Sequence, residues 1–199
     1  TADGDPVGYM QDLSGNGNHA TAPGEAARPV YRHQGGLHYL QMDGVDDSLV
    51  VPSYVIGRNS YPNGTMLSAA IEYTGTGDRF NVLGSIKGSN RRYYIVTGPS
   101  VTGNQMQFGI GSAFESTGYE FTKGRAFVAG MGWESGEFVG REDGEEVVRA
   151  AGSWGSEGGT LYLGTVPGNG RVDDHFNGRF YGVIIRDEYD SSSGEALRY

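Results

Sequence analysis

Carboxylate side chains gather in short stretches of this 199-residue chain, and such clusters could hold a metal ion. Asp43, Asp46 and Asp47 lie within five residues, next to Gly44. Calcium takes about six to eight oxygen ligands, which loops rich in Asp and Gly can supply. Asp side chains in turns also accept hydrogen bonds from nearby backbone amides. No EF-hand loop pattern is present, so we interpret Asp43 and Asp47 as residues that cap a turn.

The residue types needed for catalysis occur without the expected spacing. The chain has four scattered histidines, His19, His33, His38 and His175. They form no H-x-H or H-E-x-x-H pair for zinc. A glycosidase needs two carboxylates about 5–9.5 Å apart across a cleft, whereas residues 142–146 (EDGEE) fall at an Asp-Gly turn and predict a solvated hairpin tip. Ser14 and Ser153 lie near glycines but in no G-x-S-x-G elbow. We therefore expect no enzymatic activity.

Residues 15–20 (GNGNHA) satisfy the dinucleotide-binding pattern G-x-G-x-x-G/A. That pattern requires an apolar strand before it and a helix after it. No such strand precedes this segment, and Pro23 and Gly24 interrupt any helix after it. We interpret the segment as a turn.

Aromatic residues beside Gly-, Ser- and Asn-rich segments are suited to sugar binding. A ring covers the apolar face of a pyranose at low entropic cost, while polar neighbours bond the hydroxyl groups. Trp154 lies between Gly152-Ser153 and Gly155-Ser156 and is the most loop-like of these rings. Our candidate glycan-binding residues are Trp154, Tyr61, Tyr93, Tyr119 and Asn90.

The composition excludes several classes of partner. The net charge is −9 and the longest basic run is Arg91-Arg92, so nucleic-acid binding is not expected. Cysteine is absent, which excludes disulfides and thiol chemistry. The sequence has no apolar run near the roughly 20 residues of a membrane span and no secretory signal. It begins like the middle of a longer polypeptide, so we expect a module of one.

Short β-rich segments must position these groups. Alternation and β-branched or aromatic content predict nine strands, at 66–74, 79–87, 92–97, 105–111, 125–133, 137–141, 145–149, 160–163 and 178–186. Many of the 35 glycines fall between such segments. Short helices are expected only at 53–58 and 191–199. The pattern predicts an all-β fold, an antiparallel two-sheet β-sandwich in one domain over residues 1–199.

Two hairpins are predicted. Leu40 and Met42 precede the turn at 43–47, and Leu49 and Val51 follow it, each pair on one face of a half-buried strand. A second hairpin is expected at Asp143-Gly144, between 137–141 and 145–149.

Four segments together resemble a known family. Residues 14–20 (SGNGNHA), 42–47 (MDGVDD), 161–164 (LYLG) and 178–185 (GRFYGVII) are similar to laminin-G-like, or concanavalin-A-like, jelly-roll domains of bacterial surface proteins and phage tail-associated or virion-surface proteins. The resemblance implies a jelly roll that binds rather than catalyses.

The resemblance also implies a structural calcium site in many relatives, where the first turn meets the last strand. Asp12, Asn16 and Asp187 are the candidate ligands here. The closing strand of relatives often supplies an Asp, but this chain has Tyr181 at that position. No cofactor is expected to be required.

These observations lead to a functional prediction. We expect a non-catalytic module that binds surface glycan, on a virion or an extracellular bacterial protein, presented in a homo-oligomer such as a trimer or with virion proteins. The alternatives are a structural domain that decorates a viral assembly through protein contacts and, third, a glycan-cleaving enzyme.

Overall fold

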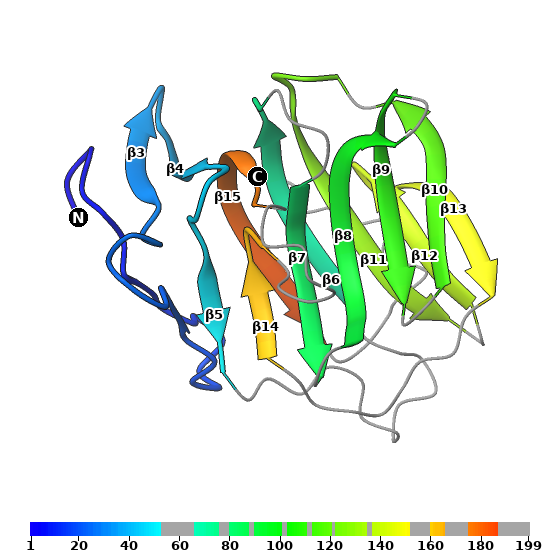
Figure 1. The fold of residues 1–199 in the computed structure, drawn as a ribbon, viewed down its shortest axis with the longest axis horizontal. Coiled ribbons are helices and arrows are strands. Elements are labelled where there is room, and N and C mark those ends of the chain that lie inside the picture. The colour runs from blue at the N-terminus through cyan, green and yellow to red at the C-terminus, as the bar shows by residue number, and fades with distance from the viewer. Residues whose placement is uncertain are drawn as a thin grey trace.

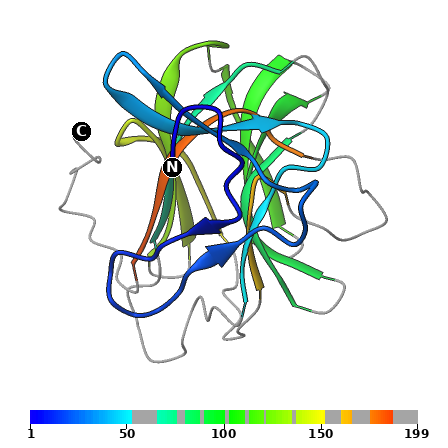
Figure 2. The ribbon, with the colours of Figure 1, turned by 90° about the vertical axis from the view of Figure 1, so that its left-hand side faces the viewer.

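The computed structural model describes residues 1–52, 66–75, 80–87, 90–100, 103–110, 113–120, 122–134, 137–151, 160–165 and 175–186. All regular structure in these segments is β, and no helix occurs in them. Two sheets face each other as the layers of a sandwich (Figures 1 and 2). The predicted all-β antiparallel jelly-roll sandwich is confirmed. Within these segments nothing helical is long and apolar enough to span a membrane.

Eight strands form the front sheet in Figure 1. In spatial order they are β1 (Tyr9–Met10), β2 (Ala20–Thr21), β5 (Leu49–Val51), β14 (Thr160–Leu163), β7 (Phe80–Lys87), β8 (Asn90–Ser100), β9 (Gly103–Ile110) and β10 (Ala113–Glu120).

Seven strands form the second sheet. Their order is β13 (Glu145–Ala151), β12 (Glu137–Glu142), β11 (Ala126–Glu134), β6 (Met66–Tyr73), β15 (Asn177–Arg186), β4 (Leu37–Asp43) and β3 (Val30–Gln34). The strand pairs in both sheets are antiparallel.

Side chains from the inner faces of both sheets form one core. Successive residues of a strand point to opposite faces, so every second residue enters the core. Phe108 of one sheet packs with Phe138 of the other in a cluster that includes Phe180 and Ile71, all nearly inaccessible to solvent. On the opposite faces of these strands, apolar side chains such as Val139 and Ala70 stand beside polar ones such as Glu72.

Neighbouring segments cover three of the four sheet edges, those of β3, β10 and β13. The N-terminal segment lies along β3, where Pro6 bridges Val30 and the backbone of Gly4 and Asp5 bonds that of Tyr31. At the other side, edge strands β10 and β13 of the two sheets lie next to each other (Figure 1). Covered edges resist pairing with other chains.

The predicted hairpin over residues 40–51 is wrong. β4 belongs to the seven-stranded sheet and β5 to the eight-stranded sheet, so the turn at 43–47 carries the chain from one layer to the other. Leu40, Met42, Leu49 and Val51 are all buried in the shared core, as their alternation predicts. Alternation identifies the buried face of a strand but does not identify its partner.

The remaining strand predictions agree with the structure, with differences of a few residues at the ends. The nine predicted segments correspond to β6–β9 and β11–β15. The hairpin between β12 and β13 is confirmed, and its turn residues Asp143 and Gly144 both have positive φ. Strands β1, β2, β3 and β10 were not predicted. Both predicted helices, 53–58 and 191–199, lie outside the described residues.

Candidate functional site

The side chains of all five predicted glycan-binding residues lie outside what the structure describes. Trp154 and Tyr61 are outside the described residues. Asn90 and Tyr93 lie in β8 and Tyr119 lies in β10. Tyr93 is therefore inside a strand rather than at a loop edge.

The first predicted turn is organised by Asp12. Its Oδ1 accepts a 2.8 Å bond from the Ser14 amide, and its Oδ2 accepts a 2.8 Å bond from the Asn18 amide. Hydrogen bonds from the Ser14 side chain and then from these amides hold the pKa of Asp12 below its usual value. Gly15 and Gly17 have positive φ, which confirms the turn. The Asn16 amide donates to Ser14 Oγ in the same loop, while Asp187, the third predicted calcium ligand, lies outside the described residues.

The second turn has the predicted capping role for its acidic residues. Asp43 Oδ1 accepts bonds from the amides of Val45 (2.8 Å) and Asp46 (3.3 Å), and Asp47 Oδ2 accepts one from the Asp43 amide (2.9 Å). Carboxylate oxygens of the three aspartates lie within 4.8 Å of one another. Burial, and secondarily the charge of Asp43, raises the pKa of Asp47 to about 6. These contacts explain the cluster as a capped turn.

Asn177, at the start of β15, fixes this turn to the seven-stranded sheet. Its Nδ2 donates to the Asp43 carbonyl at 2.9 Å, and its own carbonyl accepts bonds from the amides of Thr74 and Gly75. Gly44 leaves space for this side chain, because a Cβ there would lie 2.7 Å from the Asn177 Cβ. The first and last parts of the chain meet at this residue.

A polar and aromatic cluster lies on the outer face of the seven-stranded sheet. The ladder registers place Gln41 of β4 and Glu72 of β6 on either side of Arg179 of β15. Their neighbours along each strand, such as Met42, Ile71 and Phe180, are in the core, so this row points away from it. Tyr39 and Tyr181 lie beside the row. We name Tyr39, Gln41, Glu72, Arg179 and Tyr181 the outer-face cluster.

Hydrogen bonds hold the outer-face cluster in one arrangement. Glu72 Oε2 accepts bonds from the Tyr181 hydroxyl (2.9 Å) and Arg179 Nη1 (3.2 Å). The Arg179 guanidinium lies over the Tyr39 ring, 4.9 Å from its centroid, and that ring is tilted against Tyr181. Gln41 Nε2 donates to the Gly178 carbonyl at 3.1 Å. Glu72 is only 9% exposed, so loss of these partners would leave a nearly buried carboxylate unpaired.

The electrostatics of the cluster follow from its burial and its internal hydrogen bonds. Burial is the main reason why the pKa of Tyr181 is raised, and its bond to Glu72 adds to the effect. The bond to Tyr181 raises the pKa of Arg179, and the Nε atom of Arg179 is buried without a hydrogen-bond partner. The arrangement holds a guanidinium, an amide and a phenol in fixed positions. The Tyr181 hydroxyl is protonated at neutral pH and the Glu72 carboxylate is already paired, so the outer-face cluster supplies no activated nucleophile.

The prediction of a solvated tip at 142–146 is wrong for Glu142. This side chain is 4% exposed and forms an ion pair with Arg125, which also bonds Asp143 Oδ2 at 2.6 Å. Burial raises the pKa of Glu142, although Arg125 acts in the opposite direction. Glu145 and Glu146 are exposed, as predicted.

The description of the histidines as scattered is wrong for two of them. His33 and His38 are paired across β3 and β4, joined by the two-residue turn Gly35-Gly36, and their rings stack. A Gly-Gly pair between alternating segments is the sequence feature that predicts this hairpin. The outer-face cluster has a comparable sequence feature, since Gln41, Glu72 and Arg179 are polar residues between apolar neighbours.

Comparison with solved structures finds this fold in proteins of low sequence identity. Domain 4 of AbnA, an extracellular GH43 arabinanase of Geobacillus stearothermophilus solved with arabinotriose, gives a TM-score of 0.62 at 13% identity, over 84% of this chain and 79% of that one. A Trypanosoma rangeli sialidase solved with sialic acid gives 0.68 at 12% identity. The match covers 96% of this chain but 31% of the sialidase, so this chain spans about a third of that enzyme.

A heptameric SAP-like pentraxin of Limulus polyphemus gives a TM-score of 0.51 at 11% identity, over 71% of this chain and 76% of that one. No family model and no curated protein matches the chain. At these identities the likeness shows a shared β-sandwich fold.

Proposed function

We propose that this domain is a non-catalytic carbohydrate-binding module and that the outer-face cluster contacts the sugar. The observation that carries the proposal is the row of Gln41, Arg179 and Glu72 beside Tyr181 on a sheet face, with its donors held in place by a nearly buried carboxylate. Sugar hydroxyl groups are bonded by such amide, guanidinium and phenol groups, and rings cover the apolar faces.

The structural neighbours support a carbohydrate ligand in general terms. One is a domain solved with arabinotriose and another is a sialidase solved with sialic acid. Fold likeness alone cannot assign a function, because function depends on the site. The loop candidates Trp154 and Tyr61 stay predictions for a second contact region, and a non-catalytic role stays a proposal.

The setting we propose is the surface of a virion or an extracellular bacterial protein, with several copies of the module presented together. Weak single sites gain about 10²–10⁴ in avidity when they are linked. The alternative structural role requires a protein contact, and its simplest form is strand addition at a sheet edge. The edges at β3, β10 and β13 are covered by the N-terminal segment and by the adjacency of β10 and β13, which disfavours that form at these three strands.

A glycan array probed with an oligomerised form of the domain tests the proposal. Tyr181→Phe removes one hydroxyl while Arg179 stays bonded to Glu72, and Gln41→Ala removes one amide. Each change is expected to weaken the affinity for the sugar about tenfold, which corresponds to a loss of about 1.4 kcal/mol of binding free energy. Trp154→Ala reports separately on the loop region.

The three variants distinguish the outer-face cluster from the loop region as the binding site. Loss of binding in Tyr181→Phe and Gln41→Ala supports the outer-face cluster, and loss only in Trp154→Ala moves the site to the loops. Blank arrays with the wild-type oligomer would refute carbohydrate binding. Release of reducing ends from a bound polysaccharide would refute the non-catalytic role.

A further inference from the structure

His33 and His38 form an exposed imidazole pair at the end of the β3–β4 hairpin. They are direct cross-strand partners. Their ring centroids are 4.3 Å apart and the ring planes differ by 7°. Direct partners on antiparallel strands have Cβ atoms about 4.5–5.5 Å apart, so both side chains project from the same patch. Both residues are exposed to solvent.

Neighbouring groups orient this pair. The Tyr31 hydroxyl lies 2.5 Å from His38 Nδ1, and the Tyr31 ring also stacks with the His38 ring at a centroid distance of 5.9 Å. When His38 carries its proton on Nδ1, Tyr31 accepts that hydrogen bond and the lone pair on Nε2 is left free. The His33 amide donates to Asp3 Oδ1 at 2.8 Å, which fixes the backbone of the second histidine to the N-terminal segment.

Metal-binding histidines commonly have this arrangement. The ring nitrogen that does not bind the ion donates to an oxygen, which fixes the tautomer and the ring direction. Zinc binds imidazole nitrogen at about 2.0–2.1 Å. Both side chains are exposed, so the rings can rotate out of the stack until one nitrogen of each reaches a shared ion.

We propose that His33 and His38 bind a divalent transition-metal ion that prefers imidazole ligands, represented by Zn²⁺, with Tyr31 as the residue that orients His38. Among the described residues no third His, Asp or Glu joins the pair. Water or a group from a binding partner completes the coordination, so the site is open. Hard ions such as Ca²⁺ prefer oxygen ligands and are expected to be excluded.

The test is a titration of the whole chain with Zn²⁺, followed through the imidazole NMR resonances. The His33 and His38 resonances are expected to shift together, while those of His19 and His175 serve as internal controls. His33→Ala and His38→Ala should each abolish the shift of the remaining partner. Tyr31→Phe should weaken the apparent affinity by about tenfold, because it removes only the orienting hydroxyl.

Other results would overturn the proposal. Unshifted His33 and His38 resonances with Zn²⁺ in large excess would show that the pair is only a surface stack. Equal responses of all four histidines, or an unchanged response in His33→Ala, would indicate diffuse binding. Ca²⁺ at the same concentrations should leave the pair unshifted, and a shift with Ca²⁺ would contradict the assigned chemistry. Unchanged resonances outside the hairpin will verify that each variant is folded.

Discussion

Asp47 provides a direct test of how burial controls stability in this fold. Its side chain is 5% exposed and lies beside the carboxylates of Asp43 and Asp46. Burial raises its pKa from the ordinary 3.8 to about 6. The native state therefore binds a proton more tightly than the unfolded state, and Asp47 contributes most stability below its ordinary pKa. That contribution is lost as the pH rises from about 4 to above 6.

The size of the loss follows from the two pKa values. The difference between 3.8 and about 6 corresponds to roughly 3 kcal/mol once the carboxyl is fully ionised in both states. Asp47→Asn should remove this penalty, because a carboxamide oxygen can accept the same 2.9 Å bond from the Asp43 amide. We expect the variant to be more stable than wild type at pH 7.5, by up to about 3 kcal/mol, and nearly equal at pH 4.

Urea unfolding at a series of pH values between 4 and 7.5 measures this directly. The free energy of unfolding of wild type minus that of Asp47→Asn should become more negative as the pH rises. Asp46→Asn is the matched control, because it removes the same charge from a less buried side chain and should stabilise the domain less than Asp47→Asn at pH 7.5. A constant difference between wild type and Asp47→Asn, or destabilisation by Asp47→Asn at pH 7.5, would refute the reasoning.

Three further predictions concern the turns and their support. Gly178→Ala should destabilise the domain by at least about 3 kcal/mol in urea unfolding, because the new Cβ would lie 2.2 Å from the Glu72 carbonyl oxygen. Gly24 has open space around it, so Gly24→Ala should change the free energy of unfolding by less than about 0.5 kcal/mol. Similar values for the two variants would contradict the argument. Asn177→Ala should lower the free energy of unfolding by about 1–2 kcal/mol, because the Asp43 carbonyl loses its hydrogen bond. An unchanged midpoint of urea unfolding would show that water replaces the side chain. A calcium chelator should leave the thermal midpoint unchanged, because both Asp12 oxygens already accept backbone amides; a lower midpoint with chelator would instead support the predicted structural calcium.

The sequence predicts the class of fold because its main features are local. Alternation identifies which residues are buried, and Asp-Gly or Gly-rich turns mark where strands end. The partner of each strand is a non-local property. The segments around the turn at 43–47 have the alternation of a hairpin, but they enter different sheets because both buried faces must contact one shared core. Strand β10 was missed because its sequence, AFESTGYE, has little apolar alternation.

The candidate site is less predictable for the same reason. Glu72 and Arg179 are 107 residues apart in sequence, and only the register of β6 and β15 brings them together. Tyr181 was considered only as a missing calcium ligand, whereas its hydroxyl bonds the Glu72 carboxylate. His33 and His38 have no metal-binding spacing along the chain, and only the hairpin turn at Gly35-Gly36 brings them together. Pairing across strands, rather than spacing along the chain, creates each of these contacts.

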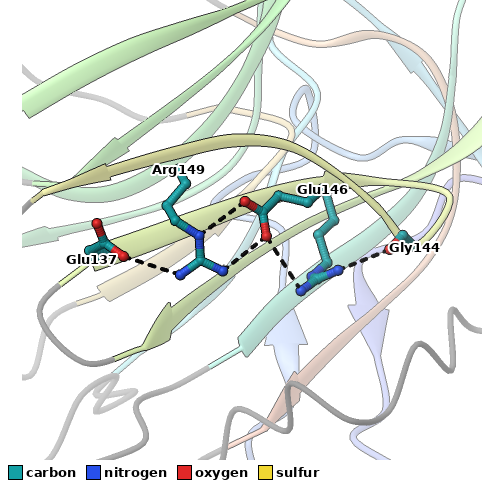
Figure 3. Close-up of polar contacts among 5 residues, drawn as sticks. Glu137, Gly144, Glu146 and Arg149 are labelled. Atoms are coloured by element: carbon teal, nitrogen blue, oxygen red, sulfur yellow. Dashed lines mark hydrogen bonds and ion pairs between the residues drawn. The ribbon is translucent and has the colours of Figure 1, made fainter.

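Charged residues at a sheet edge also limit strand addition by a partner protein. β13, an edge of the seven-stranded sheet, is tied to β12 by a ladder of charges in which Arg149 bonds both Glu137 and Glu146 (Figure 3). Arg141 continues the ladder to Glu146 and to the Gly144 carbonyl. Charges of this kind at an edge oppose the addition of another strand. These contacts therefore disfavour strand addition at β13, and the binding sites that we propose lie instead on a sheet face and at a hairpin end.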